Sequence, residues 1–191
     1  MKVAILIGSI RKGRQSQKAA YLIEKKLEAR GVEVDIIDLA ENTLPMLEER
    51  ADRDPQVSPD VIAVGKRLAV ADSVILLSPE YHGSYTGVLK NALDYYRAEF
   101  QKKPIGVIAV SSGKMAGINA SVQMQHLVLS MGAYALPQKF LVPDITNTID
   151  EHGHTEVAAL QAQADKFAEE FLWLTQAIVS AKNNQTKKEL V

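Results

Sequence analysis

Two short segments of the chain carry the residue types from which a ligand site can be built. The first, residues 8–16, contains glycine, serine, arginine and glutamine directly after an apolar run. The second, residues 79–87, begins with proline, glutamate, tyrosine and histidine, and it also follows an apolar run. Hydroxyls, an arginine fork and the open N–H groups of a helix start are groups that bind phosphate. The aromatic and heterocyclic side chains of the second segment suit a flat ring.

The first segment is a candidate phosphate-binding loop. Its candidate ligands are Ser9, Arg11, Gln15 and Ser16. Arg11 can hold two phosphate oxygens through its planar guanidinium. The segment matches neither of the two glycine-rich nucleotide fingerprints. Taken alone, it leaves open that Ser16 only caps a helix and that the charges are solvated.

The second segment is a candidate ring-binding loop. Pro79 fixes its own φ and favours an extended residue before it, so the chain must turn sharply where the strand ends. We expect the backbone N–H groups of residues 80–83 to meet the polar edge of a ring. The candidate ring contacts are Pro79, Glu80, Tyr81, His82 and Gly83. Taken singly, Tyr81 is more typical of a rim aromatic and His82 of a surface turn. Glu80 taken singly is typical of a solvated charge or a helix-dipole partner.

A third loop, residues 111–117, offers two hydroxyls and two glycines after another apolar run. We expect Ser111 and Gly113 to cover the other edge of the ring, although loops rich in serine and glycine are common. A phosphate site and a flat-ring site in adjoining loops together predict a bound flavin mononucleotide (FMN). The chain is therefore predicted to be a redox enzyme.

The elements that position these loops alternate between strand and helix, which predicts an α/β fold with an open parallel sheet. Short apolar runs predict buried strands at residues 3–7, 32–39, 73–78, 105–110 and 140–142. Helical spacing predicts a helix after each of the first four strands and a long last helix. Ser58-Pro59-Asp60 predicts the start of the second of these helices. Residues 40–57, with Pro45 and Pro55, read as a long loop. In such sheets ligands bind beyond the carboxyl ends of the strands, where all three loops lie.

Composition narrows the function classes. The chain has 191 residues, and 47% of them are apolar. This length favours a single domain, which we predict over residues 1–181, followed by a frayed tail at residues 182–191. A net charge of −1 argues against general binding to nucleic acid or anionic membranes. The absence of cysteine excludes disulfides and thiolate chemistry.

Without a signal peptide or a membrane-length apolar run, a cytoplasmic location is expected. The sequence around His152 and His154 is typical of a solvated loop, so we do not predict a metal site there.

Taken together, the motifs resemble those of the NADPH-dependent FMN reductase family of flavodoxin-like proteins. The resemblance covers about residues 1–142. It rests on the G-S-x-R loop with Ser16, on the S-S-G loop at 111–113, and above all on the run P-E-Y-x-x-S-x-x-G-x-L-K-N-x-x-D from Pro79 to Asp94. It implies a flavodoxin-like three-layer sandwich, in which helices cover both faces of a five-stranded parallel sheet of order 2-1-3-4-5.

The resemblance also assigns roles to the three loops. The first would bind the FMN phosphate, the second would contact the isoalloxazine, and the third would lie near its far side. The sequence departs from the family at two positions, since His82 stands where asparagine is usual and Thr86 where proline is usual. Histidine still donates a hydrogen bond but adds a group that titrates near neutrality.

The implied reaction moves a hydride from NADPH, or NADH, to FMN and then to a small acceptor such as a quinone, azo compound, metal oxyanion or flavin. No catalytic side chain is predicted, because flavin N5 carries the chemistry. The resemblance implies a homodimer or homotetramer. Three alternatives stay open: a flavodoxin-type electron carrier, which is usually more acidic than this chain, a non-catalytic flavin-binding sensor, and a phosphate-ester enzyme on the same scaffold.

Overall fold

A parallel β-sheet forms the centre of the protein in the computed structural model, which describes residues 1–49, 51, 53 and 56–189. Its strands are β1 (Lys2–Ile7), β2 (Glu33–Asp38), β3 (Ser73–Pro79), β4 (Pro104–Val110), β5 (Tyr134–Ala135) and β6 (Phe140–Val142). The strand order is β2-β1-β3-β4-β5, with β6 also paired to β4. The predicted order 2-1-3-4-5 is therefore confirmed.

The fifth position of the sheet is shared by two short strands. The predicted strand at residues 140–142 is β6, which pairs with the last three residues of β4. The unpredicted β5 pairs with the first two residues of β4. Pro137 lies between β5 and β6 and has no N–H to donate to the sheet, so a single continuous edge strand is interrupted there.

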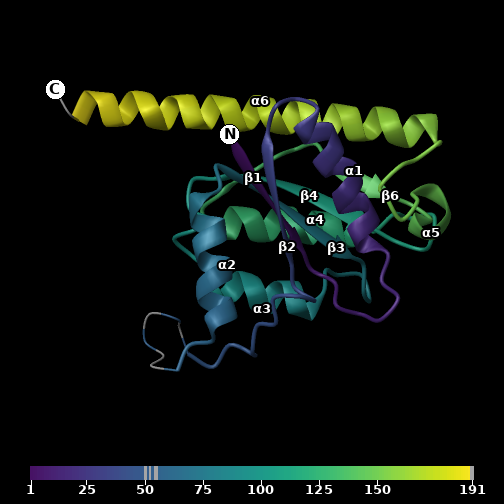
Figure 1. Ribbon diagram of the computed structural model, residues 1–191, viewed down its shortest axis with the longest axis horizontal. Helices are drawn as coiled ribbons and strands as arrows, with labels where there is room; N and C mark the ends of the chain where they lie inside the picture. Colours follow the sequence, from purple (N-terminus) through teal and green to yellow (C-terminus); the bar gives the residue numbers. More distant parts are fainter. Residues whose placement is uncertain (50, 52, 54–55, 190–191) are drawn as a thin grey trace.

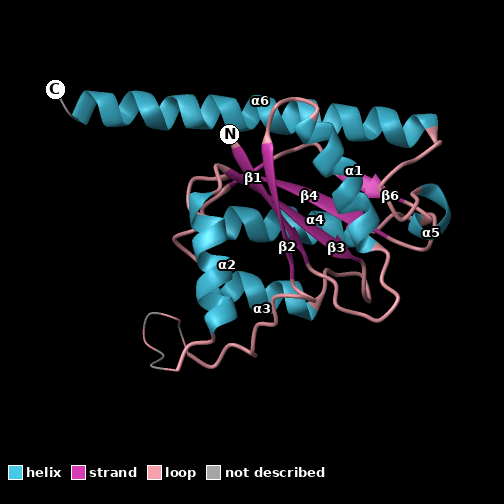
Figure 2. Cartoon of the chain, in the orientation of Figure 1, coloured by secondary structure: helices cyan, strands magenta, loops and turns pink. Residues whose placement is uncertain are grey.

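The helices form the two outer layers (Figures 1 and 2). They are α1 (Ser16–Glu28), α2 (Pro59–Val70), α3 (Gly87–Tyr95), α4 (Ile118–Ser130), α5 (Ile145–Thr148) and α6 (Ala158–Glu189). One face of the sheet is covered by α1 and α6, and the other by α2, α3 and α4. The predicted start of α2 is confirmed, because the Ser58 hydroxyl accepts a hydrogen bond from Asp60 N at 3.3 Å. The four-residue α5 was not predicted.

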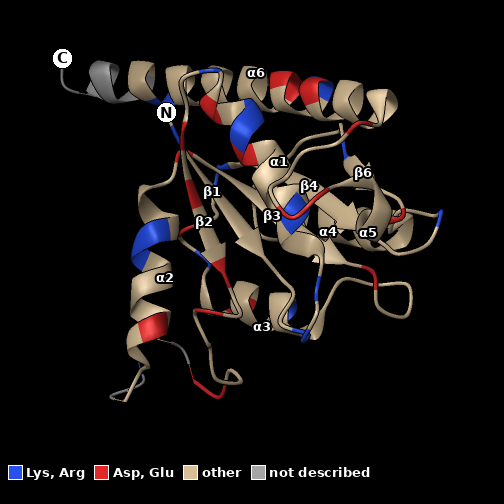
Figure 3. Cartoon of the chain, turned by 45° about the vertical axis from the view of Figure 1, so that its right-hand side comes forward, with Lys and Arg blue, Asp and Glu red and all other residues tan. Residues whose placement is uncertain are grey.

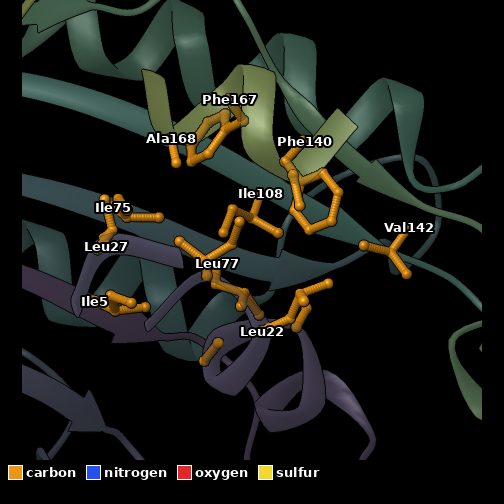
Figure 4. Packing of buried hydrophobic residues seen from close by; sticks show 14 of the residues in the cluster. Ile5, Leu22, Leu27, Ile75, Leu77, Ile108, Phe140, Val142, Phe167 and Ala168 are labelled. Carbon is orange, nitrogen blue, oxygen red and sulfur yellow. The ribbon is translucent and has the colours of Figure 1, made fainter. Parts of the chain in front are cut away.

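Alternation along the central strands separates two hydrophobic cores. In β1, Ile5 and Ile7 face α1 and α6, whereas Ala4 and Leu6 face the opposite layer. Figure 4 shows the first core, in which side chains from α1 and α6 meet over the strands. The residues labelled there are Ile5, Leu22, Leu27, Ile75, Leu77, Ile108, Phe140, Val142, Phe167 and Ala168. Burial on both faces explains why the strands read as continuous apolar runs.

The last helix includes most of the residues for which the sequence predicts a frayed tail. A frayed tail is expected from residue 182, but α6 continues to Glu189, and its C-terminal end extends beyond the sheet (Figure 1). The stretch contains lysine, glutamine and glutamate, which favour helix, and it contains no glycine or proline to end one.

The long loop between β2 and α2 was predicted over residues 40–57. Its described residues form neither helix nor strand, while positions 50, 52, 54 and 55, including Pro55, lie outside the described residues. Asn91 of α3 holds this loop: its Oδ1 accepts from Leu47 N at 2.9 Å, and its Nδ2 donates to Pro45 O at 2.7 Å. The start of the loop is thereby fixed beside the carboxyl ends of the strands.

The charged residues are distributed over the helices without a single-sign face in the view of Figure 3. Acidic and basic residues both occur along α1, α2 and α6. This matches the nearly equal totals of 22 basic and 23 acidic residues. Within the described residues, none of the helices is long and apolar enough to span a membrane.

Candidate active site

The three loops singled out in the sequence meet at the carboxyl edge of the sheet, at the lower right in Figure 1. They enclose a cavity of about 300 Å³. The predicted site residues that line it are Ser9, Arg11, Gln15, Ser16, Pro79, Glu80, Tyr81 and Ser111. Residues from loops far apart in the chain thus come together as expected for an open parallel sheet.

The other predicted residues lie outside this cavity. His82 lines an adjoining hollow of about 400 Å³ together with Arg11, Glu80 and Tyr81. Gly83 and Gly113 line neither space. The cavity also has walls that sequence reasoning missed: Lys12, Gly13, Arg14, Val110, Ser112, Ile145 and Thr146.

The first loop presents unpaired polar groups to the cavity. Ser9 is buried, and among the described residues its hydroxyl finds no hydrogen-bond partner. Ser16 is the first residue of α1, so the helix is capped by Gln15, whose side chain makes no capping bond. Within the described chain, no acceptor is found for the N–H groups of Ser16 and Gln17. The open helix start and the hydroxyl make this end of the cavity suitable for an anion.

The Arg11 side chain bridges the first two loops. Its guanidinium carbon lies 5.6 Å from the centre of the Tyr81 ring. Arg11 is exposed, and in the described part of the chain no carboxylate pairs with it. A cation over an aromatic face is attracted by the ring quadrupole, while its N–H groups stay available for another partner.

The second loop is a tight hairpin turn. Tyr81 N donates to Ser84 O at 2.8 Å, and Ser84 N donates to Tyr81 O at 3.0 Å. The two residues between them, His82 and Gly83, have positive φ of 50° and 77°. Positive φ at both central positions defines a type I′ turn, for which Asn-Gly is the favoured pair. The asparagine usual in the family therefore suits this backbone, and His82 occupies the same conformation at greater cost.

This hairpin corrects part of the ring-binding prediction. The N–H of Glu80 donates to Val110 O at 3.3 Å, and that of Tyr81 is used in the turn. Of the backbone N–H groups at residues 80–83, only those of His82 and Gly83 are without an acceptor within the described residues. The loop thus offers fewer free backbone N–H groups to a ring than the sequence predicts.

The Glu80 side chain anchors the loop to α4. Its carboxylate accepts hydrogen bonds from Asn119 N at 3.0 Å, from Ala120 N at 3.1 Å and from Asn119 Nδ2 at 3.2 Å. The N-cap of α4 is Gly117, which has no side chain, so Glu80 satisfies the helix start from outside. One turn farther along α4, Gln123 Nε2 donates to Gly83 O at 2.7 Å. The glutamate acts as a helix-dipole partner, which is one of the roles considered from the sequence.

The unusual Thr86 joins the first loop to the second. Its hydroxyl donates to Gly8 O and accepts from Leu89 N at 3.2 Å, which caps α3. Its N–H donates to the Ser78 hydroxyl at 3.1 Å. The φ of −71° would suit the proline that is usual in the family, but proline would lose all three hydrogen bonds.

The third loop is tied to the segment after β6. Ser111 N donates to Val142 O and Ser111 O accepts from Ile145 N, both at 3.0 Å. The Ser111 hydroxyl oxygen accepts from Gly113 N at 2.9 Å within the same loop. These bonds bring Thr146 to the cavity wall. No local pattern in the sequence marks Thr146, because its place depends on the pairing of β6 with β4.

The two histidines of the loop before α6 have local partners. His154 Nε2 lies 2.9 Å from Lys25 Nζ, and the backbone N–H groups of His152 and His154 donate to Asp150. In the described ranges, the structure contains no group of three or more potential metal-binding side chains.

Replacing His82 by asparagine is expected to stabilise the protein. Asparagine adopts positive φ more readily than histidine, so His82→Asn should raise the free energy of unfolding by up to about 1 kcal/mol. Urea denaturation of the two proteins measures the difference. A lower unfolding free energy for His82→Asn would show that the histidine side chain makes a stabilising contact that outweighs the strain in the turn.

An α/β sheet of this order, with a cavity at its carboxyl edge, defines the flavodoxin-like class. The model of the NADPH-dependent FMN reductase family matches residues 1–147. The chain belongs to this family. The predicted fold, the enzyme class, the cofactor FMN and NADPH as electron donor are thereby confirmed.

Individual relatives agree with the family over the whole chain. The FMN-dependent NADPH-azoreductase of Staphylococcus haemolyticus is 29% identical, and that of Staphylococcus aureus (strain USA300) is 30% identical, each with full coverage of both sequences. Among solved structures, the flavoenzyme NAD(P)H:(acceptor) oxidoreductase FerB from Paracoccus denitrificans superposes with a TM-score of 0.72 at 24% identity. That match covers 89% of this chain and 96% of FerB.

Proposed function

We propose that the chain holds FMN in the cavity at the carboxyl edge of the sheet and uses it to pass electrons from NADPH to a quinone or an azo compound. Ser9, Arg11, Gln15 and Ser16 would hold the phosphate. The walls formed by Pro79, Glu80, Tyr81 and Ser111 would hold the ring system. When bound, FMN supplies the chemistry, since it can accept a hydride from NADPH and give it to the acceptor.

The observation that carries the proposal is the buried Ser9 hydroxyl, which has no partner in the described part of the chain and lines the same cavity as the open start of α1. An unpaired buried polar group costs free energy, and so do buried N–H groups without acceptors. A phosphate oxygen would satisfy both, and the helix dipole would favour its negative charge. The residues present therefore fit the phosphate end of FMN.

The ring end is supported by the rigidity of the second loop. Glu80 and Gln123 tie the loop to α4, and Thr86 ties it to the first loop. The remaining N–H groups of His82 and Gly83 can donate to ring carbonyl or nitrogen atoms. A loop held from both sides loses little conformational freedom when a ligand binds.

The adjoining hollow lined by Arg11, Glu80, Tyr81 and His82 is our candidate place for NADPH and the acceptor to bind in turn. Quinones and azo compounds are favoured because the relatives that match the full chain are NADPH-azoreductases. One NADPH and one proton reduce a quinone to a hydroquinone, whereas two of each cleave an azo bond to two amines. We further propose a single-domain cytoplasmic enzyme that works as a homodimer or homotetramer, as the resemblance implies.

The test is an anaerobic titration of the FMN-loaded protein with NADPH. We expect the flavin absorbance to bleach and then to return when a quinone or an azo dye is added. Protein that binds FMN but does not react with NADPH would be a carrier or a sensor, and the reductase proposal would be wrong. Protein that does not bind FMN at all would contradict the site itself.

A further inference from the structure

We infer that Arg14 and Asp38 form a positioning pair that shapes the phosphate loop, and that Arg14 does not itself hold the phosphate. The inference rests on the proposed FMN site. It concerns an arginine that lies inside the candidate loop and lines its cavity, where a direct phosphate contact would be the simplest expectation.

The Arg14 guanidinium is already engaged by the protein. Its Nη1 donates to Asp38 Oδ1 at 2.5 Å and to Ser9 O at 2.6 Å, and its Nη2 donates to Asp38 Oδ2. Only 17% of the Arg14 side chain and 9% of the Asp38 side chain are exposed. The hydrogen bonds to Asp38 raise the pKa of Arg14 above its ordinary value. Both hydrogens of Nη1 are donated in these bonds, and the two Nη atoms of Arg14 face the two carboxylate oxygens of Asp38.

Asp38 is fixed to the sheet. It is the last residue of β2, directly opposite Ile7 at the end of β1. Its Oδ1 also accepts from Ala40 N at 2.9 Å, which sets the orientation of the carboxylate. A charge held by two neighbouring strands is a rigid support for the loop between β1 and α1.

The pair transmits this rigidity to Ser9. The bond from Arg14 to Ser9 O fixes the peptide group that follows Ser9. The hydroxyl of the same residue is buried and has no partner within the described ranges. Because Asp38 neutralises Arg14, the net positive charge of the loop near the cavity comes from Arg11 and Lys12. A preformed loop spends less binding energy on ordering itself around a ligand.

Asp38→Asn separates the two possible roles of Arg14. If the pair positions the loop, this substitution should weaken FMN binding by about tenfold, because the bidentate contact is lost. If Arg14 holds the phosphate directly, removing its competing carboxylate should leave FMN binding unchanged or make it tighter. Arg14→Gln should weaken FMN binding in both cases, and Arg14→Lys should restore it only in part, since lysine lacks the fork.

The readout is the dissociation constant of FMN and of riboflavin, measured by flavin fluorescence on the apoprotein of each variant. Riboflavin lacks the phosphate, so the ratio of the two constants isolates the phosphate end. The matched control is Asp35→Asn, on the same strand, whose carboxylate pairs with Arg67 at 2.5 Å. That substitution removes an equivalent pair away from the cavity and should leave the ratio within about twofold of the parent value.

We expect Asp38→Asn to lower the preference for FMN over riboflavin while Asp35→Asn does not. Unchanged or tighter FMN binding in Asp38→Asn would overturn the inference, and so would an equal loss of affinity for both flavins. If the parent protein binds FMN no more tightly than riboflavin, the proposed phosphate site is itself wrong. That last outcome would be seen in the parent protein, without any variant. It can therefore be distinguished from a result that contradicts only the positioning role of Arg14 and Asp38.

Discussion

Arg11→Ala is expected to weaken FMN binding by about 10- to 100-fold while the protein stays folded. Arg11 lines both the cavity and the adjoining hollow, and its guanidinium has no competing carboxylate among the described residues. A hydrogen bond between two charged groups contributes more than one between neutral groups. Since the side chain is exposed, its loss removes little packing.

The measurement is the dissociation constant of FMN for the apoproteins, together with flavin content after dialysis. Riboflavin binding should change much less, because Arg11 is assigned to the phosphate. Arg11→Lys should lie between the parent and Arg11→Ala, since lysine keeps the charge but loses the fork. Full retention of FMN by Arg11→Ala would show that the phosphate does not contact Arg11.

Phe167→Ala is expected to lower the free energy of unfolding by about 3–5 kcal/mol, the largest loss of stability we predict. Phe167 is fully buried in α6 and stacks on Phe171, with ring centres 5.9 Å apart and planes 3° apart. Its ring also lies over Gly106 of β4, where an added Cβ would be only 2.8 Å from the ring. Removing the ring leaves a cavity between α6 and the sheet that rigid neighbours cannot fill.

Urea denaturation measures this loss. The control is Trp173→Ala on the same helix, which removes a larger side chain that is 70% exposed and should change stability by less than about 0.5 kcal/mol. A similar small change for Phe167→Ala would mean that α6 contributes little to the folded core. FMN affinity should be nearly unaffected in both variants, because α6 supplies none of the described cavity walls.

The fold was predictable from local patterns because the central strands are buried on both faces. Continuous apolar runs such as residues 73–78 are typical of parallel strands, and Ser58-Pro59-Asp60 marked the start of α2. The short β5 and the four-residue α5 escaped prediction because they depend on contacts with distant residues. The sequence does not locate the end of α6, because the polar composition after residue 181 is typical of a solvated tail although its residues favour helix.

The candidate site was predictable to the level of loops but not of individual contacts. Most of the predicted residues line one cavity, since parallel strands bring their carboxyl ends to one edge. The carboxylate of Glu80 could equally have faced solvent, and only the position of α4 shows that it caps that helix. Likewise, nothing in the local sequence shows that Arg14 pairs with a residue 24 positions away.

The sequence by itself determined the strand and helix pattern, the family and hence the cofactor, because these depend on local periodicity and on short motifs. Only the tertiary structure decided which polar side chains are already used by the protein and which remain for a ligand. Arg14, Glu80 and Thr86 are held by partners from other elements, whereas the Ser9 hydroxyl has no partner among the residues that the structure describes. Hydrogen bonding depends on distance in space, which the order of residues along the chain does not contain.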